Sequence, residues 1–288
     1  MSSLTIQAAS AAIMPELMLD FFSSSVMQDA LAPALFIAFV SASISVMILA
    51  HRLSFLTVGV SHASLAGLGL AVTFALPLLP TATFFCVGIA LLLASLPKSK
   101  GITEDTGTGL LFAGSMALGI ILMSQASRNQ VDLFGLLFGN ILTVTESEWH
   151  WLLLIGSFIT LMFLCMARAW WSIAFDPITA SASGLPVSLL NLCLYGTVGL
   201  AVVMCVKLAG IVLTTGLMVL PATCVWFWGR SLISLWLMSI AVAISGTLIG
   251  LIISYHYDWP SGATIVLTLC MIFMISWGAT WFTQKHKR

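Results

Sequence analysis

His62 is the residue of this 288-residue chain with the strongest case for chemistry, because it lies inside an apolar segment beside small side chains. The segment at residues 51–72 reads HRLSFLTVGVSHASLAGLGLAV, and serines and glycines flank the histidine. Small residues permit close helix packing, and an ionisable residue inside a membrane helix is a candidate functional residue. A neutral imidazole suits zinc and other borderline divalent ions. The alternative is a packing histidine that hydrogen-bonds a neighbouring helix, and the residues alone favour neither.

A weaker candidate lies in the segment SYHYDWPSGATIVL at residues 254–267, where His256 and Asp258 could briefly hold a cation. The surrounding tyrosines and tryptophan are typical of a membrane interface. We therefore favour a solvated loop with aromatic anchors over a metal site. A second polar cluster is interpreted as capping and solvating a helix start: Glu146, Glu148 and His150.

The segment AWWSIAFDPITASASGLP at residues 169–186 predicts a short capped helix. Asp176 is a typical N-cap residue and Pro177 suits the first helical position, while Gly184 marks the end. Small side chains lie between them, including Ala180, and would let the helix seat closely in a groove on a partner. Short isolated helices are marginal in water. An ordinary capped turn at the membrane interface is the alternative of equal weight.

The composition indicates that these residues lie in a membrane protein. Only 7% of the residues are charged and 60% are hydrophobic, with a mean hydropathy of +1.12. Soluble domains are about a quarter charged, so a water-soluble globule is excluded. The net charge is zero and no basic face occurs, which disfavours nucleic acid as a partner. The six cysteines form no C-x-x-C pair, so neither a disulfide framework nor a zinc ribbon is indicated.

The apolar runs predict an all-α polytopic membrane protein with about eight to nine transmembrane helices. Residues 1–28 are predicted as an interfacial segment and 29–288 as the transmembrane domain, with a cytoplasmic loop at about 169–186. The stretch 132–143 is too short to span. Only Lys207 and Leu208 separate two of the runs, so one of these is a candidate broken or re-entrant helix. The predicted spans are 31–50, 56–76, 81–96, 108–125, 149–166, 187–206, 209–228, 232–255 and 263–282.

Charge asymmetry predicts the orientation. With the N-terminus outside and the C-terminus inside, eight of the ten basic residues fall on the inner side, leaving Arg128 and Lys207 outside. No phosphate-binding G-x-x-x-x-G-K-[ST] loop occurs, so ATP-driven transport would need a separate ATPase. A secondary, ion-gradient-driven metal cation transporter is the alternative. It is disfavoured because every Asp and Glu falls at or beyond a predicted span end. An intramembrane enzyme is disfavoured because H-E-x-x-H and a plausible set of catalytic residues are absent.

Five motifs occur together in one order along nearly the whole chain from about Met27. They are RLSF…SHASLAGLGLA, VDLFGLLFGNIL, FDPITASASGL, LAGIVLTTGLMVLPA and YDWPSGATIVL. With them the chain resembles the membrane permease subunits of bacterial ATP-binding-cassette (ABC) importers for zinc, manganese and iron, of the zinc-uptake type. One of these motifs alone would be weak evidence, whereas five in order are highly specific.

The resemblance implies a type II ABC importer-like permease in the bacterial cytoplasmic membrane. It implies three partners: a cytoplasmic ATPase, a periplasmic metal-binding protein, and a second permease copy, either identical or paralogous. The segment with Asp176, Pro177, Ala180 and Gly184 would be the coupling helix that docks on the ATPase. His62 would contact the transported metal. The chain would bind no cofactor and would not itself be an enzyme.

One departure from the family pattern affects the expected cargo. Family members usually carry an aspartate four residues before the histidine, and here that position is Val58. Imidazole is then the only obvious ligand in the pathway, and it suits zinc better than manganese or iron(II), which want more carboxylate oxygen. The sequence therefore predicts zinc as the preferred cargo. His51, where the family commonly has arginine, is interpreted as a minor departure.

Overall fold

The computed structural model describes residues 25–96, 103–125, 144–229 and 231–285, and all its regular elements are helices. Most of the predicted interfacial segment and the whole apolar stretch 132–143 lie outside these described residues. The helices are α2 (Ser25–Ala50), α3 (Ser54–Thr73), α4 (Leu78–Ser95), α5 (Glu104–Gln125), α7 (Glu146–Phe175), α8 (Pro177–Ala182), α9 (Val187–Val225), α10 (Leu232–Tyr257) and α11 (Ser261–Lys285).

Eight helical segments are long and apolar enough to cross a membrane in the described part of the chain. The all-α polytopic prediction is therefore confirmed. The two predicted spans 187–206 and 209–228 form a single element, α9, which breaks at Gly210. Only the first part, Val187–Val206, has spanning length, and the second, Leu213–Val225, is shorter. Gly210 adopts φ 77° and ψ 168°, an extended conformation with positive φ that glycine reaches without steric cost.

The largest boundary difference is at the end of α7, which the sequence placed at residue 166 and the structure places at Phe175. Neither glycine nor proline interrupts residues 167–175, so nothing ends the helix until Pro177 disfavours helical backbone in the residue before it. The predicted loop 169–186 is consequently shorter, because its first seven residues belong to α7. The connection between α7 and α9 consists mainly of the short helix α8.

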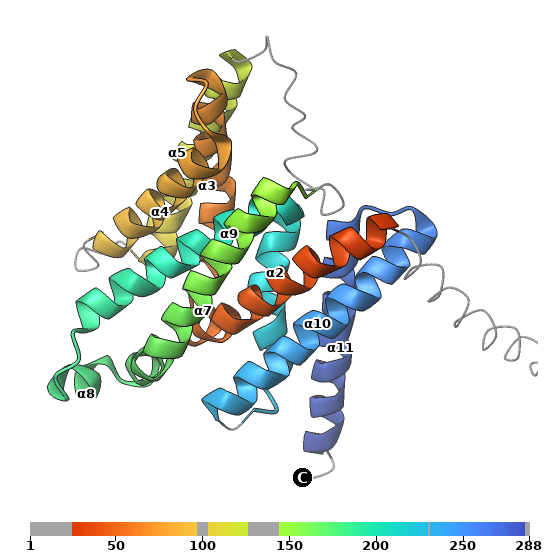
Figure 1. Ribbon diagram of the computed structural model, residues 1–288. Helices are drawn as coiled ribbons and strands as arrows, with labels where there is room; N and C mark the ends of the chain where they lie inside the picture. Colours follow the sequence, from red (N-terminus) through yellow and green to blue (C-terminus); the bar gives the residue numbers. More distant parts are fainter. Residues whose placement is uncertain (1–24, 97–102, 126–143, 230, 286–288) are drawn as a thin grey trace, which may run out of the picture.

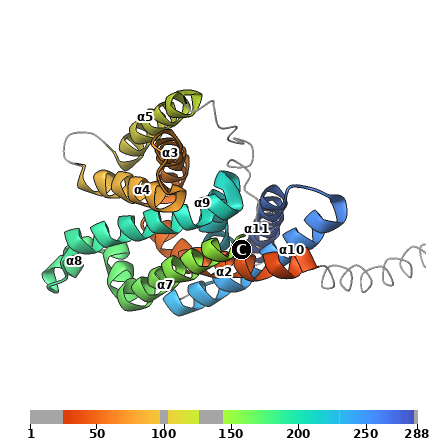
Figure 2. The ribbon, with the colours of Figure 1, turned by 45° about the horizontal axis from the view of Figure 1, so that its top comes forward.

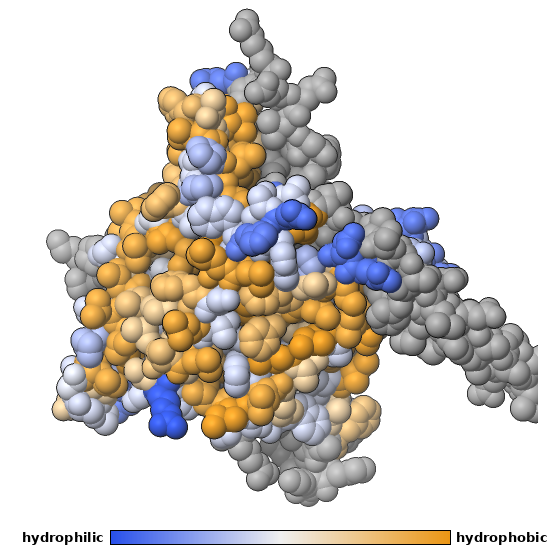
Figure 3. All heavy atoms as spheres, viewed as in Figure 1, coloured by the Kyte–Doolittle hydropathy of each residue, from blue (hydrophilic) through white to orange (hydrophobic). Residues whose placement is uncertain are grey.

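Helix α9 occupies the centre of the protein. It packs against α2, α3, α4, α7, α10 and α11. Helices α3, α4 and α5 form a group on one side of it, while α2, α7 and α10 lie on the other (Figures 1 and 2). Side chains on the face seen in Figure 3 are predominantly hydrophobic, as expected for helices in contact with lipid.

Buried serines of α2 join it to both parts of α9. The Ser41 hydroxyl lies 3.1 Å from Cys205 Sγ in the first part, and Ser45 Oγ accepts a hydrogen bond of 3.2 Å from the Ala222 N–H in the second. Ala222 follows Pro221, which lacks an N–H and disturbs the regular helix hydrogen bonds there. Since lipid offers no hydrogen bonds, such internal partners are required.

Glycines let α3 and α5 approach closely. A side chain at Gly119 of α5 would lie 2.9 Å from the backbone nitrogen of Ala66 on α3. A side chain at Gly59 of α3 would lie 2.5 Å from the Thr108 methyl group of α5. The two helices are therefore fixed against each other at two levels.

Gly119→Ala should destabilise the protein by about 1–3 kcal/mol, because the new methyl group overlaps backbone that cannot move aside. The matched control is Gly114→Ala on the same helix, where a side chain would meet nothing within 4 Å. Thermal unfolding in detergent measures both variants, and we expect a lower melting temperature only for Gly119→Ala. Equal melting temperatures would contradict the close α3–α5 contact.

Candidate functional site

His62 lies on α3 with a half-buried side chain whose ring orientation is set by the backbone one turn earlier. Its Nδ1 is 2.9 Å from the carbonyl oxygen of Val58. A carbonyl oxygen can only accept, so Nδ1 carries the proton and donates it in the neutral ring. The lone pair is thereby left on Nε2, which has no hydrogen-bond partner among the described residues. This is the arrangement in which histidine binds a metal.

An aromatic ring of the neighbouring helix covers part of this imidazole. Phe112 of α5 meets His62 edge to face, with 4.9 Å between ring centroids and 78° between planes. The nearby serine hydroxyls are engaged with their own helix: Ser61 Oγ donates to Thr57 O at 2.6 Å, and Ser64 Oγ to Ser61 O at 2.5 Å. Within the described ranges, no group of three or more His, Cys, Asp or Glu residues could hold a metal ion. His62 therefore belongs to no such group in the described part of the chain.

The weaker candidates, His256 and Asp258, lie exposed at the end of α10. The His256 ring packs edge to face on Tyr257, at 5.1 Å. Asp258 is the C-cap residue and adopts a left-handed conformation with φ 52°. The turn is closed by Ser254, whose hydroxyl donates to the Trp259 carbonyl at 2.6 Å. The exposure of His256 and Asp258 and the aromatic contact fit a solvated loop with aromatic anchors, which is the interpretation that the sequence favoured.

The short helix α8 begins as its sequence predicts. Asp176 is its N-cap, and Oδ1 accepts hydrogen bonds from the N–H groups of Ile178 (3.0 Å) and Thr179 (3.1 Å). The Thr179 hydroxyl donates to Oδ2. The hydrogen bonds from Thr179, its hydroxyl first, hold the pKa of Asp176 below its usual value despite slight desolvation. With a depressed pKa, the cap contributes fully above the unfolded-state value of about 3.9 and is lost only as the pH falls through the folded value. It is intact at neutral pH.

In the rest of α8, Ala180 is buried against the protein, whereas Pro177 is exposed. Ala180 is only 1% exposed and packs into the protein's own core, so it seats the helix instead of facing solvent. Gly184 ends the segment with φ 86°, and the N–H of Leu185 bonds to the Ala180 carbonyl at 3.2 Å. Pro177 at the first helical position is exposed.

Sequence reasoning missed the exposed apolar residues beside Pro177. Phe175 and Ile178 are 68% and 81% exposed. Both stand next to the Asp176–Pro177 pair, and their apolar type beside such a strong helix-start signal was the available clue. They give this end of the protein an apolar surface that a partner could cover.

Sequence reasoning also missed Trp170, which fixes the two helices on either side of α8. Its side chain is fully buried, and Nε1 donates to the Leu190 carbonyl of α9 at 2.8 Å. Its own carbonyl lies 2.9 Å from Nε2 of His51, between α2 and α3. His51, interpreted from the sequence as a minor departure, thus connects the end of α7 to the start of the helix that carries His62. The tandem tryptophans before Asp176 were the only sequence signal.

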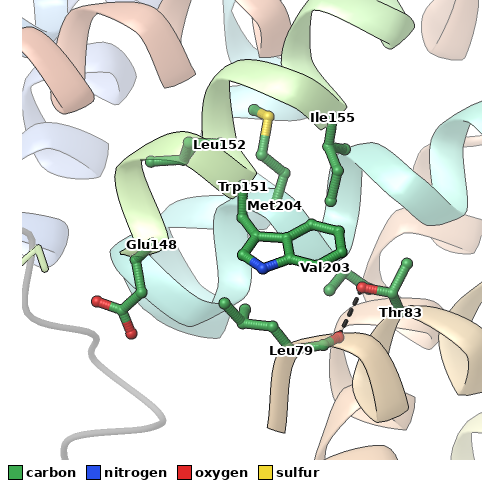
Figure 4. A pocket seen from close by; sticks show the side chains of 8 residues that line it. All are labelled: Leu79, Thr83, Glu148, Trp151, Leu152, Ile155, Val203 and Met204. Atoms are coloured by element: carbon green, nitrogen blue, oxygen red, sulfur yellow. Dashed lines mark hydrogen bonds between the residues drawn. The ribbon is translucent and has the colours of Figure 1, made fainter. Parts of the chain in front are cut away.

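A small pocket lies between α4, α7 and α9, and neither His62 nor any residue of α8 lines it (Figure 4). Apolar side chains line most of it, with Glu148 at the α7 end. That carboxylate accepts a hydrogen bond from the Thr145 N–H at 3.0 Å and completes the capping box of α7. The expectation that this acidic cluster caps a helix is confirmed for Glu148.

Comparison with known proteins shows which class of protein this chain resembles. Residues 23–279 match the ABC 3 transport family. The chain is 29% identical to the manganese import system permease protein ScaB of Streptococcus gordonii, over 87% of this chain and 90% of that protein. It is also 29% identical to a probable iron transport system membrane protein of Haemophilus influenzae, over 87% and 92%.

The solved structures agree. A solved structure of PsaBC from Streptococcus pneumoniae in complex with Fab superposes with a TM-score of 0.81 at 27% identity, covering 91% of this chain and 95% of that one. A putative metal-chelate type ABC transporter in an inward-facing conformation shares the fold, with a TM-score of 0.66 at 16% identity.

The fold and the matches define a multi-pass permease of the bacterial cytoplasmic membrane. The chain belongs to the ABC 3 transport family, since the match spans most of its length. The resemblance to permeases of metal ABC importers, expected from its five motifs, is confirmed, and the relatives named here are manganese and iron transport proteins.

Proposed function

We propose that this chain is the permease subunit of an ATP-driven importer that moves a divalent transition metal into the cell, with zinc as the preferred cargo. The observation that carries the proposal is the His62 imidazole within a permease fold: the Val58 carbonyl holds its Nδ1, and its Nε2 has no hydrogen-bond partner among the described residues. A single imidazole binds an ion weakly, which suits a pathway because an ion must also leave.

We further propose that α8 docks on a separate ATPase at the cytoplasmic face, with Asp176 and Gly184 fixing its two ends. The exposed Phe175 and Ile178 supply apolar contacts to that partner. Movement of α8 passes directly to α7 and α9, which flank it, and reaches the start of α3 through Trp170 and His51. A periplasmic binding protein delivers the metal, and a second permease copy encloses the path.

Zinc is proposed because His62 offers nitrogen and Val58 brings no carboxylate oxygen. Manganese is the second candidate, because several relatives of this chain are named for manganese or iron transport. Zinc favours imidazole, whereas manganese favours carboxylate oxygen.

Metal uptake by cells whose only copy of this gene is on a plasmid tests the proposal. Zinc, manganese and iron are followed in parallel at limiting external concentration. We expect zinc uptake to depend on the plasmid, and Val58→Asp to shift the preference toward manganese. Plasmid-dependent uptake of manganese alone would replace zinc with manganese. Uptake of all three metals at the level of plasmid-free cells would refute the transport proposal.

A further inference from the structure

We propose that Phe112 is a positioning residue that holds the His62 imidazole with Nε2 presented to the metal, and that it thereby favours zinc over manganese. The inference rests on the proposed function, because it assigns Phe112 a role through the pathway histidine.

A single hydrogen bond does not fix the imidazole. The torsion between Cβ and the ring of a histidine is broad and has no sharp minima. The Val58 carbonyl holds Nδ1 at 2.9 Å, but the ring can still tilt around that contact. The neighbouring hydroxyls of Ser61 and Ser64 are bonded to backbone carbonyls and give no further support. A second contact is therefore needed to fix the ring.

Phe112 is placed to supply this restriction. The two rings meet edge to face with centroids 4.9 Å apart, inside the favourable range of about 4.5–7 Å for such pairs. Among the described residues, the ring of His62 makes one hydrogen bond, from Nδ1 to the Val58 carbonyl, and one aromatic contact, with Phe112.

Phe112 is itself held in place by the packing of α5 on α3. Thr108, one turn before it, lies against Gly59, and Gly119, two turns after it, lies against the backbone of Ala66. These contacts flank the His62–Phe112 pair on both helices. The backbone that carries Phe112 is therefore held at a fixed distance from the backbone that carries His62.

The consequence of a loosened imidazole differs between metals. Zinc takes nitrogen ligands readily, whereas manganese favours oxygen. Residues that orient a ligating histidine commonly contribute about 10- to 100-fold to metal affinity or activity. Loss of the aromatic contact should therefore reduce zinc transport more than manganese transport, whereas a general packing defect would reduce both equally.

The test compares Phe112→Leu, which removes the ring, with Phe112→Tyr, which retains it. Phe84→Leu is the matched control, because this α4 ring is 80% exposed. Zinc and manganese uptake are measured in cells carrying the complete transporter and are normalised to the amount of permease in the membrane. We expect Phe112→Leu to lose about tenfold in zinc uptake, with a clearly smaller loss for manganese. Phe112→Tyr and Phe84→Leu should remain close to the native protein.

Zinc uptake at the native level in Phe112→Leu would overturn the proposal. So would an equal loss for both metals, or a loss matched by a lower membrane level, since either outcome assigns Phe112 to packing alone. His62→Ala, measured in parallel, separates this failure from failure of the proposed function. If His62→Ala loses zinc uptake and Phe112→Leu does not, only the role of Phe112 falls. If His62→Ala keeps zinc uptake, the pathway role of His62 falls with it.

Discussion

His62→Ala should lower zinc uptake by about 10- to 100-fold, because loss of a ligand costs at least as much as loss of a residue that orients it. In the structure this imidazole is held by a backbone carbonyl and its Nε2 is unpaired among the described residues, so alanine removes the one nitrogen that an ion could meet there. The fold should persist, since the half-buried side chain fills little of the core. Uptake of labelled zinc, normalised to permease in the membrane, is the measurement.

His150→Ala is the matched control for this substitution. His150 lies on α7 with the same local geometry, its Nδ1 being 2.7 Å from the carbonyl oxygen of Glu146 four residues earlier, but its side chain is exposed at the helix start. We expect native uptake from this variant. If both histidine variants transport zinc like the native protein, His62 is a packing residue and the metal contact must be sought elsewhere.

Gly184→Val should reduce uptake at least about tenfold while the protein still reaches the membrane. Gly184 adopts φ 86°, which costs an L-residue roughly 1–2 kcal/mol and a β-branched one more. A side chain there would meet nothing within 4 Å, so the effect arises from the backbone alone. The strain would pull apart the turn that closes α8 and misdirect the segment proposed to dock on the ATPase. Uptake and membrane level are measured together.

Gly184→Asn distinguishes backbone geometry from the mere presence of a side chain. Asparagine tolerates the left-handed conformation far better than valine. It should keep most of the uptake. Equal loss in both variants would point to a direct steric clash with the partner, and native uptake from Gly184→Val would remove the end of α8 from the coupling proposal.

The start and end of α8 could be predicted from the sequence, because they depend on residues that lie next to each other in the chain. Asp176, Pro177 and Gly184 act on backbone within a few positions of themselves, so the helix start and end follow from residue type. The end of α7 was predicted nine residues too early because the hydropathy of a span was used, while the backbone continues until a residue stops it. The break in α9 was anticipated from the two residues between apolar runs, and the structure places it at Gly210.

Contacts between distant residues could not be predicted in the same way. Nothing in the sequence reveals that Phe112 meets His62, or that Trp170 joins α7 to α9, because both depend on how helices pack. The sequence drew attention to the side chain of Val58 as a lost ligand, yet its carbonyl is what orients the imidazole. Every residue has a carbonyl, so only the structure identifies the one that matters.

The most direct test of the central claim is to measure which energy source drives transport. The purified permease is reconstituted into liposomes with its ATPase and zinc-loaded binding protein, and zinc entry into the liposomes is followed. We expect zinc entry that requires ATP on the side of α8 and is unaffected by a proton or sodium gradient. Entry driven by such a gradient without ATP would contradict it and would identify the chain as a secondary transporter.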